Sequence, residues 1–317
     1  MSGGRIERLQ ERLDDGRFLC VFLLVGADGA VLVDTGLATT PQRTIAPALA
    51  RLGIGWDGLR AVVVTHADVD HAGGLGAVRR LAPRATVVAG AADRLLIESS
   101  ELLLERRYRE FRDEHGIDQP EAFSAWVRAN ADDGAVDLAL TGDGTLRIDR
   151  EWTVGLLAAP GHTAGHLVVH DPASATVIAA DAVLGGFSPG AGGEPAFAPT
   201  YRFLPGYRET IARLQEIAPQ RLLCSHLPPL EGAAVAAYLR ESAAFADRCE
   251  AALLRVLDGG EPATLAELIA ATAPALASWP AAARDTLVQP LAGHLEALSA
   301  QGRVRRLPGC PARYART

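Results

Sequence analysis

Four stretches of the sequence share one pattern: an apolar run ends, and a single histidine or aspartate follows within three residues. The stretches are "AVVVTH" (61–66), "LLAAPGH" (156–162), "VIAAD" (177–181) and "RLLCSH" (221–226). Short apolar runs of this kind are typical of buried β-strands. We therefore expect a rigid sheet to hold the four polar side chains around one site.

The rest of the chain up to about residue 232 supports a layered α/β fold. Residues 18–25 and 30–36 predict two strands joined by a glycine-containing turn, and residues 39–54 have helical spacing after a Thr-Pro start. Strands alternating with helices are typical of an α/β architecture. Residues 91–131 interrupt the alternation with a charged, mostly helical insertion. It is either a lid over a substrate or simple packing.

The loop after the valine strand holds the densest group of polar residues. His66, Asp68, Asp70 and His71 lie within six positions. Imidazoles and carboxylates are the ligands of divalent metals such as zinc, and two metals need at least six protein ligand atoms. The other strand ends supply three more candidates, which are His162, Asp181 and His226. The sequence therefore predicts a site for two divalent metal ions.

The order of these motifs resembles the metallo-β-lactamase-fold superfamily. The motifs are VDTG (33–36), THxDxDHxGG (65–74), PGHTxGH (160–166), a lone Asp after a strand, and a late SH. The resemblance covers roughly residues 15–230 and implies a four-layer αββα sandwich with a dimetal site at one edge of the sheets. It divides the chain into a metallo-β-lactamase-like catalytic domain, 1–232, and a helical, winged-helix-like C-terminal domain, 233–317.

The resemblance also implies a role for each site residue. The first metal would be held by His66, Asp68 and His162. The second metal would be held by Asp70, His71 and His226. Asp181 would bridge the two ions, and Asp70 would also carry a proton to the leaving group. Asp34 would orient the ligands by hydrogen bonding from behind, and His166 would support the turn rather than bind a metal.

Asp68 departs from the family pattern, because most members have a histidine at that position. A carboxylate there favours iron or manganese more than an imidazole does, although zinc remains the expected metal. Flavodiiron proteins resemble this sequence in having a carboxylate, a glutamate, at that position, but they also carry a flavodoxin domain that we do not find here. Asp68 is also shorter than glutamate or histidine, so a single filled site is a further alternative.

These features predict a hydrolase that uses a metal-activated hydroxide on a small ester, thioester or lactone. The first alternative is an iron-dependent oxidoreductase or oxygenase on the same fold, and the second is a phosphodiesterase or nuclease. A binding protein with a structural metal site is the non-enzymatic alternative. The C-terminal domain is expected to pack on the catalytic domain or to support a homodimer.

Composition excludes several other classes. All 31 basic residues are arginine, so no mechanism can use a catalytic lysine. The net charge of −7 argues against nucleic acid as the main partner. The sequence has neither a membrane-spanning run nor the apolar core of a signal peptide, and its four cysteines are scattered. We therefore expect a reduced cytoplasmic protein, with His115 and His294 on its surface.

Overall fold

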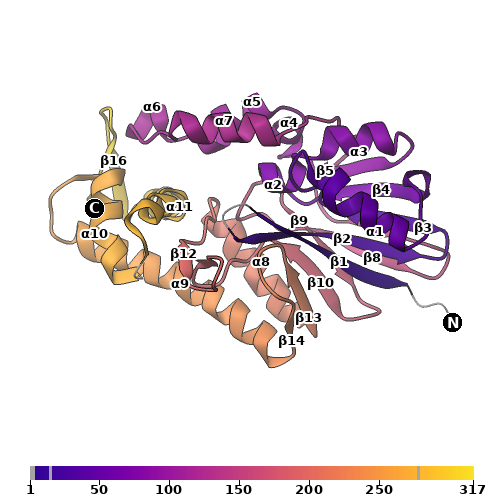
Figure 1. Cartoon of the computed structure of the whole chain (residues 1–317). Coiled ribbons are helices and arrows are strands. Elements are labelled where there is room, and N and C mark those ends of the chain that lie inside the picture. The colour runs from indigo at the N-terminus through magenta and orange to yellow at the C-terminus, as the bar shows by residue number, and fades with distance from the viewer. Residues whose placement is uncertain (1–3, 14–15, 277–278) are drawn as a thin grey trace.

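Two six-stranded sheets form the centre of the computed structural model, which describes residues 4–13, 16–276 and 279–317 (Figure 1). The first sheet has, in spatial order, β1 (Arg5–Arg12), β2 (Phe18–Gly26), β3 (Gly29–Val33), β4 (Leu59–Val64), β5 (Thr86–Gly90) and β6 (Leu138–Leu140). The second has β14 (Leu230–Glu231), β13 (Arg221–Cys224), β10 (Thr176–Ala180), β9 (Leu167–Asp171), β8 (Thr153–Ala158) and β7 (Gly144–Arg147).

Side chains alternate between the two faces of the first sheet. Along β2, Leu19 and Leu23 pack beneath the outer helices, whereas Phe22 and Leu24 face the second sheet. Burial on both faces explains the unbroken apolar run in this segment. Helices α1 (Ala46–Arg51) and α3 (Leu75–Leu81) cover the first sheet, and α8 (Leu204–Ile217) covers the second. The predicted αββα sandwich is confirmed.

The directions of the strands bring the predicted ligands to one edge. In the second sheet, β8 and β10 are both antiparallel to β9, and β13 is parallel to β10. The carboxyl ends of β8, β10 and β13 therefore meet at one edge. The backbone N–H of Leu167 donates to Thr65 O over 2.8 Å, which joins the end of β4 in the first sheet to that same edge.

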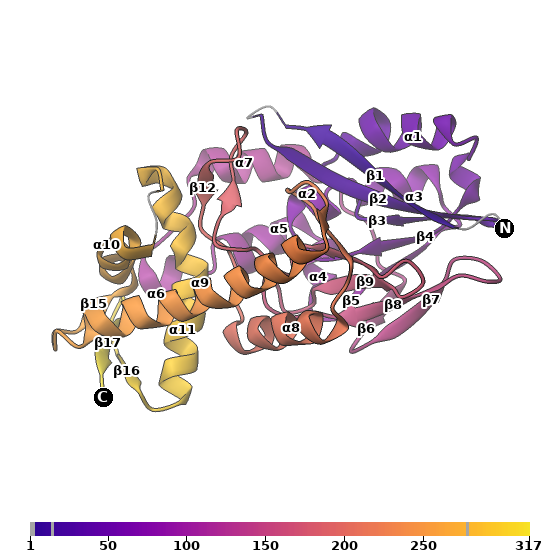
Figure 2. The same ribbon diagram turned by 90° about the horizontal axis from the view of Figure 1, so that it is seen from below.

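The insertion is helical, as predicted. It contains α4 (Arg94–Ile97), α5 (Ser100–Leu103), a π-helical turn (Leu104–Tyr108), α6 (Arg112–His115) and α7 (Glu121–Asn130). Leu103, Leu104 and Val127 pack into the core of the first sheet. The helices extend from the sandwich toward the C-terminal region in both views (Figures 1 and 2), where Glu114 pairs with Arg306.

The C-terminal region is built from helices, as predicted. It contains α9 (Ala233–Leu257), α10 (Leu265–Leu276), α11 (Val288–Ala300) and a sheet of β15 (Ala263–Thr264), β17 (Arg313–Arg316) and β16 (Val304–Leu307). The long α9 lies beside α8 (Figure 2). Its likeness to a winged helix stays a prediction. None of the described helices combines the length and the hydrophobicity needed to cross a membrane.

The expectation that His115 and His294 lie on the surface is wrong. His115 is 8% exposed and His294 is fully buried. His115 stacks on Tyr314, which belongs to β17, and the Nε2 atom of His294 forms a 2.9 Å hydrogen bond with the hydroxyl of Tyr201. Both histidines are buried because the insertion and α11 pack against other parts of the chain, which the local sequence does not reveal.

Candidate metal centre

The structure brings all seven predicted ligands together at the shared edge of the sheets. They form three overlapping groups whose ligand atoms lie within 4.8 Å of one another: His66, Asp68 and His162; Asp70, His71 and His226; and His66, His71 and Asp181. The loop after β4 carries His66 and Asp68, the short helix α2 (Val69–Ala72) carries Asp70 and His71, and the segments that follow β8, β10 and β13 carry the other three.

Asp34 and Thr65 fix the orientation of two imidazole rings. His71 Nδ1 lies 2.9 Å from Asp34 Oδ2, and His66 Nδ1 lies 3.1 Å from Thr65 Oγ1. The hydroxyl of Thr65 donates to the same carboxylate over 2.8 Å, so its lone pair is free to accept from His66. This network assigns the proton of each ring to Nδ1. The Nε2 atoms are left with lone pairs that face the site.

Two further imidazoles are held in the same way by backbone carbonyls. His162 Nδ1 lies 3.0 Å from Thr200 O, and His226 Nδ1 lies 3.0 Å from Phe18 O.

The Nε2 atoms of His66 and His71 are buried and have no hydrogen-bond partner among the described residues. Buried nitrogen lone pairs without partners are costly. A divalent cation would satisfy them, so the donor set fits a metal ion.

The distances around the second predicted position are close to those of one four-coordinate ion. His226 Nε2 lies 3.4 Å from both Asp70 Oδ2 and Asp181 Oδ2. His71 Nε2 lies 3.9 Å and 3.8 Å from the same two oxygens. A tetrahedral zinc site with bonds of 2.0–2.2 Å has ligand atoms about 3.3–3.6 Å apart. The four side chains could close on one ion with only a small movement.

The charges of this group also favour a cation. Burial lowers the pKa of the His71 imidazole, but the carboxylates of Asp70, Asp34 and Asp181 outweigh it and raise the pKa to about 10. Burial also lowers the pKa of His226, but the carboxylates of Asp181 and Asp70 outweigh it and raise the pKa to about 9. The carboxylates thus give the site a surplus of negative charge that a metal ion would balance.

Asp68 has a partner that sequence reasoning missed. Arg107, in the π-helical turn of the insertion, donates from Nε to Asp68 Oδ1 over 2.5 Å and from Nη2 to Oδ2 over 2.8 Å. Burial opposes ionisation, yet Arg107 holds the pKa of the Asp68 carboxyl well below its usual range. The insertion therefore contributes directly to the predicted first metal position.

Asp93 is a second functional candidate that sequence reasoning missed. Its buried carboxylate accepts hydrogen bonds from Ala67 N (3.2 Å), Thr163 Oγ1 (2.5 Å) and Gly165 N (2.7 Å). It thereby connects the loop after β4 to the loop after β8.

His166 lies just behind the ligands, with its ring stacked on His66 at a centroid distance of 4.7 Å.

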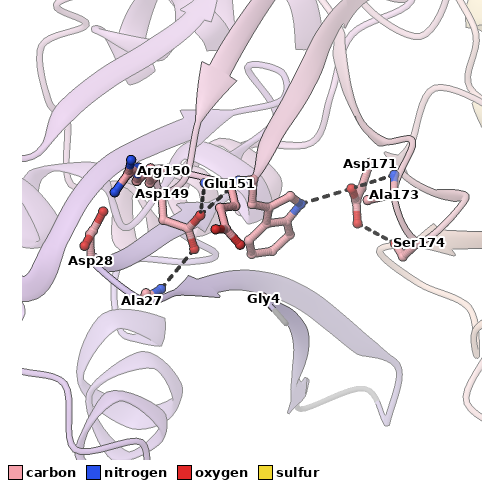
Figure 3. A pocket seen from close by; sticks show the side chains of 10 residues that line it. Gly4, Ala27, Asp28, Asp149, Arg150, Glu151, Asp171, Ala173 and Ser174 are labelled. Atoms are coloured by element: carbon pink, nitrogen blue, oxygen red, sulfur yellow. Dashed lines mark hydrogen bonds between the residues drawn. The ribbon is translucent and has the colours of Figure 1, made fainter. Parts of the chain in front are cut away.

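A larger hollow than the one beside the ligands lies elsewhere on the described structure (Figure 3). It is bordered by the β2–β3 turn and the β7–β8 turn, at the opposite end of the strands from the ligands. Its polar groups serve the turns: Asp149 accepts from the backbone of Ala27, and Trp152 Nε1 donates to Asp171 Oδ1 over 3.0 Å. We assign no chemistry to it.

Comparisons with known proteins identify the family and the fold. The family model of the metallo-beta-lactamase superfamily matches residues 16–224. A metallo-beta-lactamase family protein from Thermus thermophilus is 25% identical, with a TM-score of 0.74 over 98% of both chains. A beta-lactamase domain protein from Burkholderia ambifaria is 19% identical, with a TM-score of 0.72 over 98% of this chain and 91% of that one.

The flavodiiron core Flv1 from Synechocystis sp. PCC6803 shares the fold at 14% identity and a TM-score of 0.52, over 76% of this chain and 59% of that one. No curated protein matched the sequence. The family model covers well over half of the 317 residues and spans most of the candidate ligands. The chain belongs to the metallo-beta-lactamase superfamily.

Proposed function

We propose that the protein hydrolyses a small ester, thioester or lactone with the help of a bound divalent metal ion. The observation that carries the proposal is the convergence of buried imidazole Nε2 atoms on the carboxylates of Asp70 and Asp181. A divalent ion held there supplies a Lewis acid for the substrate carbonyl and lowers the pKa of a coordinated water toward neutrality.

The side chains of the site divide the remaining work. His71, held by Asp34, and His226, held by Phe18 O, keep their Nε2 lone pairs aimed at the ion. The side chain of Asp70 is 24% exposed, so one edge of its carboxylate reaches the solvent. Asp70 can therefore accept a proton from the attacking water and pass it to the leaving group.

The surroundings of the second position favour a small, uncharged substrate. A narrow hollow beside Asp181 and His226 is bordered by the apolar side chains of Leu184, Phe187 and Leu227. Phe187 is 38% exposed and lies at the rim. The hollow itself has room for about one water molecule, so an acyl chain or a lactone ring would rest on its apolar rim with the carbonyl facing the ligands.

The alternatives lack a supporting observation of this kind. The carboxylate at Asp68 suggested iron, but both of its oxygens are bound to Arg107. A phosphodiesterase or nuclease would need basic side chains that are free to bind phosphate. Arg303 and Arg306, however, each pair with a glutamate at 2.7 Å. Paired arginines offer less free charge to a phosphodiester.

The experiment begins with protein purified without added metal or chelator. Hydrolysis of p-nitrophenyl acetate, an acyl thioester and a lactone is measured before and after chelation and after metal is restored. We expect activity that chelation abolishes and metal restores. His71→Ala should lose it, whereas His170→Ala, a histidine of β9 outside the site, should keep it. Oxygen consumption with no hydrolysis in the panel would instead support the oxidoreductase.

A further inference from the structure

The predicted first metal position already contains a cation. The guanidinium of Arg107 binds both carboxylate oxygens of Asp68, and its Nη2 also lies 3.1 Å from His162 Nε2. We propose that this guanidinium replaces the first metal ion. The protein then binds one divalent ion per chain, at Asp70, His71, His226 and Asp181. The inference rests on the proposed function only in requiring that the protein binds a metal ion. It does not depend on which reaction the protein catalyses.

The distance between two ligand atoms supports the replacement. Asp68 Oδ2 and His162 Nε2 are 2.8 Å apart. His162 Nδ1 faces Thr200 O, and Nε2 faces the Asp68 carboxylate and Arg107 Nη2. A separation of 2.8 Å is that of a hydrogen bond or of two acceptors that share a donor, and in either case both atoms are satisfied without a metal ion. Arg107 Nη2 lies within hydrogen-bond distance of both, whereas two ligands of one tetrahedral zinc ion would be about 3.3–3.6 Å apart.

Of the three ligands expected at this position, only one remains free. Asp68 and His162 are engaged by Arg107, and His66 alone keeps an Nε2 without a partner. A single imidazole does not hold an ion tightly. A dication would also be repelled by the adjacent guanidinium. At the effective dielectric of a protein, a dication about 8 Å from the guanidinium is bound roughly 1,000-fold more weakly, and a closer one is bound more weakly still.

Arg107 is held firmly enough to keep this place. Its side chain is 8% exposed, and Nη1 donates to the carbonyl of His162 over 3.1 Å. Before it in the same turn, Leu104 is buried in the core of the first sheet. Directly after it, the hydroxyl of Tyr108 accepts a hydrogen bond from Val69 N over 3.0 Å. The turn that carries Arg107 is π-helical, a geometry frequent at functional sites.

The test counts metal ions and does not depend on activity. Wild-type protein, Arg107→Ala and the control Arg106→Ala, an exposed neighbour in the same turn, are stripped of metal and titrated with Zn²⁺ and with Mn²⁺. Calorimetry gives the affinities, and elemental analysis after gel filtration gives the stoichiometry. We expect one ion per chain in the wild type and in Arg106→Ala. Arg107→Ala should bind two, with the second held roughly 1,000-fold more tightly than any second ion in the wild type.

Two results would overturn the inference. One is a wild-type protein that binds two ions with comparable affinity, and the other is a folded Arg107→Ala protein that still binds only one. If Arg107→Ala fails to fold, the double variant Asp68→His with Arg107→Ala removes the unpaired carboxylate and must bind two ions. Wild-type protein that binds no ion would contradict the proposed function as well. One bound ion without hydrolysis would contradict the proposed function alone.

Discussion

Asp34 acts on the metal centre through His71. Its buried carboxylate accepts from His71 Nδ1, Thr65 N and Thr65 Oγ1, and its φ of 62° is one that aspartate and asparagine tolerate. We expect Asp34→Asn to fold but to weaken metal binding by about 10–100-fold, because a neutral amide orients the imidazole less strongly. Competition with a chelating dye measures the affinity.

Asp28→Asn is the matched control, since Asp28 is an exposed acid in the turn between β2 and β3. Its metal affinity should equal that of the wild type. Equal weakening in the two variants would mean that the lost charge acts at long range. The role given to the hydrogen bond between Asp34 and His71 would then be wrong.

At the level of single residues, the sequence was sufficient where a ligand directly follows a strand. Asp181 is an example, because the end of β10 at Ala180 fixes its place at the edge of the sheet. Arg107 could not be found in this way. Its partner Asp68 is 39 residues away, and nothing local separates Arg107 from Arg106, which is exposed, or from Arg109, which pairs with Asp118.

Asp93 connects elements from the two sheets. Asp93→Ala would leave the buried donors of Ala67, Thr163 and Gly165 without an acceptor. We expect the free energy of unfolding to fall by about 3–5 kcal/mol, which urea denaturation can measure. Asp113→Ala, at an exposed carboxylate, should change it by less than about 0.5 kcal/mol. A similar small change for Asp93→Ala would refute the connecting role.

His294 gives α11 a pH dependence. Burial and, to a smaller extent, Arg208 lower the pKa of its imidazole to about 3, against a smaller opposing effect of Asp247. Its Nε2 atom forms a hydrogen bond with the hydroxyl of Tyr201. Because the unfolded chain has a histidine pKa near 6.5, it binds more protons than the folded chain between pH 6.5 and pH 3. Stability is therefore lost as the pH falls through this window, by roughly 3 kcal/mol at pH 4.5.

The comparison with His294→Gln isolates this contribution from that of the carboxylates. Glutamine does not titrate, and its carbonyl can still accept from Tyr201. The free energy of unfolding, measured by urea denaturation from pH 4.5 to 7, should depend less steeply on pH in the variant. Parallel curves for the two proteins would show that His294 is not the titrating group.

Among the elements, β1 shows what the sequence pattern hid. Its sequence, RIERLQER, is mostly charged, and we did not predict a strand there. Yet Leu9 and Glu11 are 5% and 6% exposed, because they turn to one face, where Glu11 accepts from Thr44 Oγ1. Charged residues are common on strands at the edge of a sheet, where they discourage pairing with other chains. Such a strand is formed by its pairing with β2 rather than by its own hydrophobic pattern.

At the level of the whole molecule, one apolar core runs from the second sheet through α8 and α9 into α10 and α11. Phe245 of α9 is fully buried between the sandwich and the C-terminal helices, with ring centroids 6.4 Å from Tyr201 and 6.1 Å from Trp279. We expect Phe245→Ala to cost about 3–5 kcal/mol in a single unfolding transition. Phe203→Ala, at a ring that is 38% exposed, should cost less than about 1 kcal/mol. Two separate transitions in the Phe245→Ala protein would indicate that the two parts unfold independently.

Truncation after Gly232 tests the same continuity. Tyr207, Ile211 and Leu214 of α8 share their core with Val235 and Leu239 of α9, so removing α9 exposes a contiguous apolar face. Exposed faces of this kind cause association in water. The truncated protein should therefore elute as large assemblies in gel filtration with light scattering. A monodisperse fragment with full hydrolytic activity would show that the sandwich is independent of the C-terminal region, and that this region serves a separate role such as dimerisation.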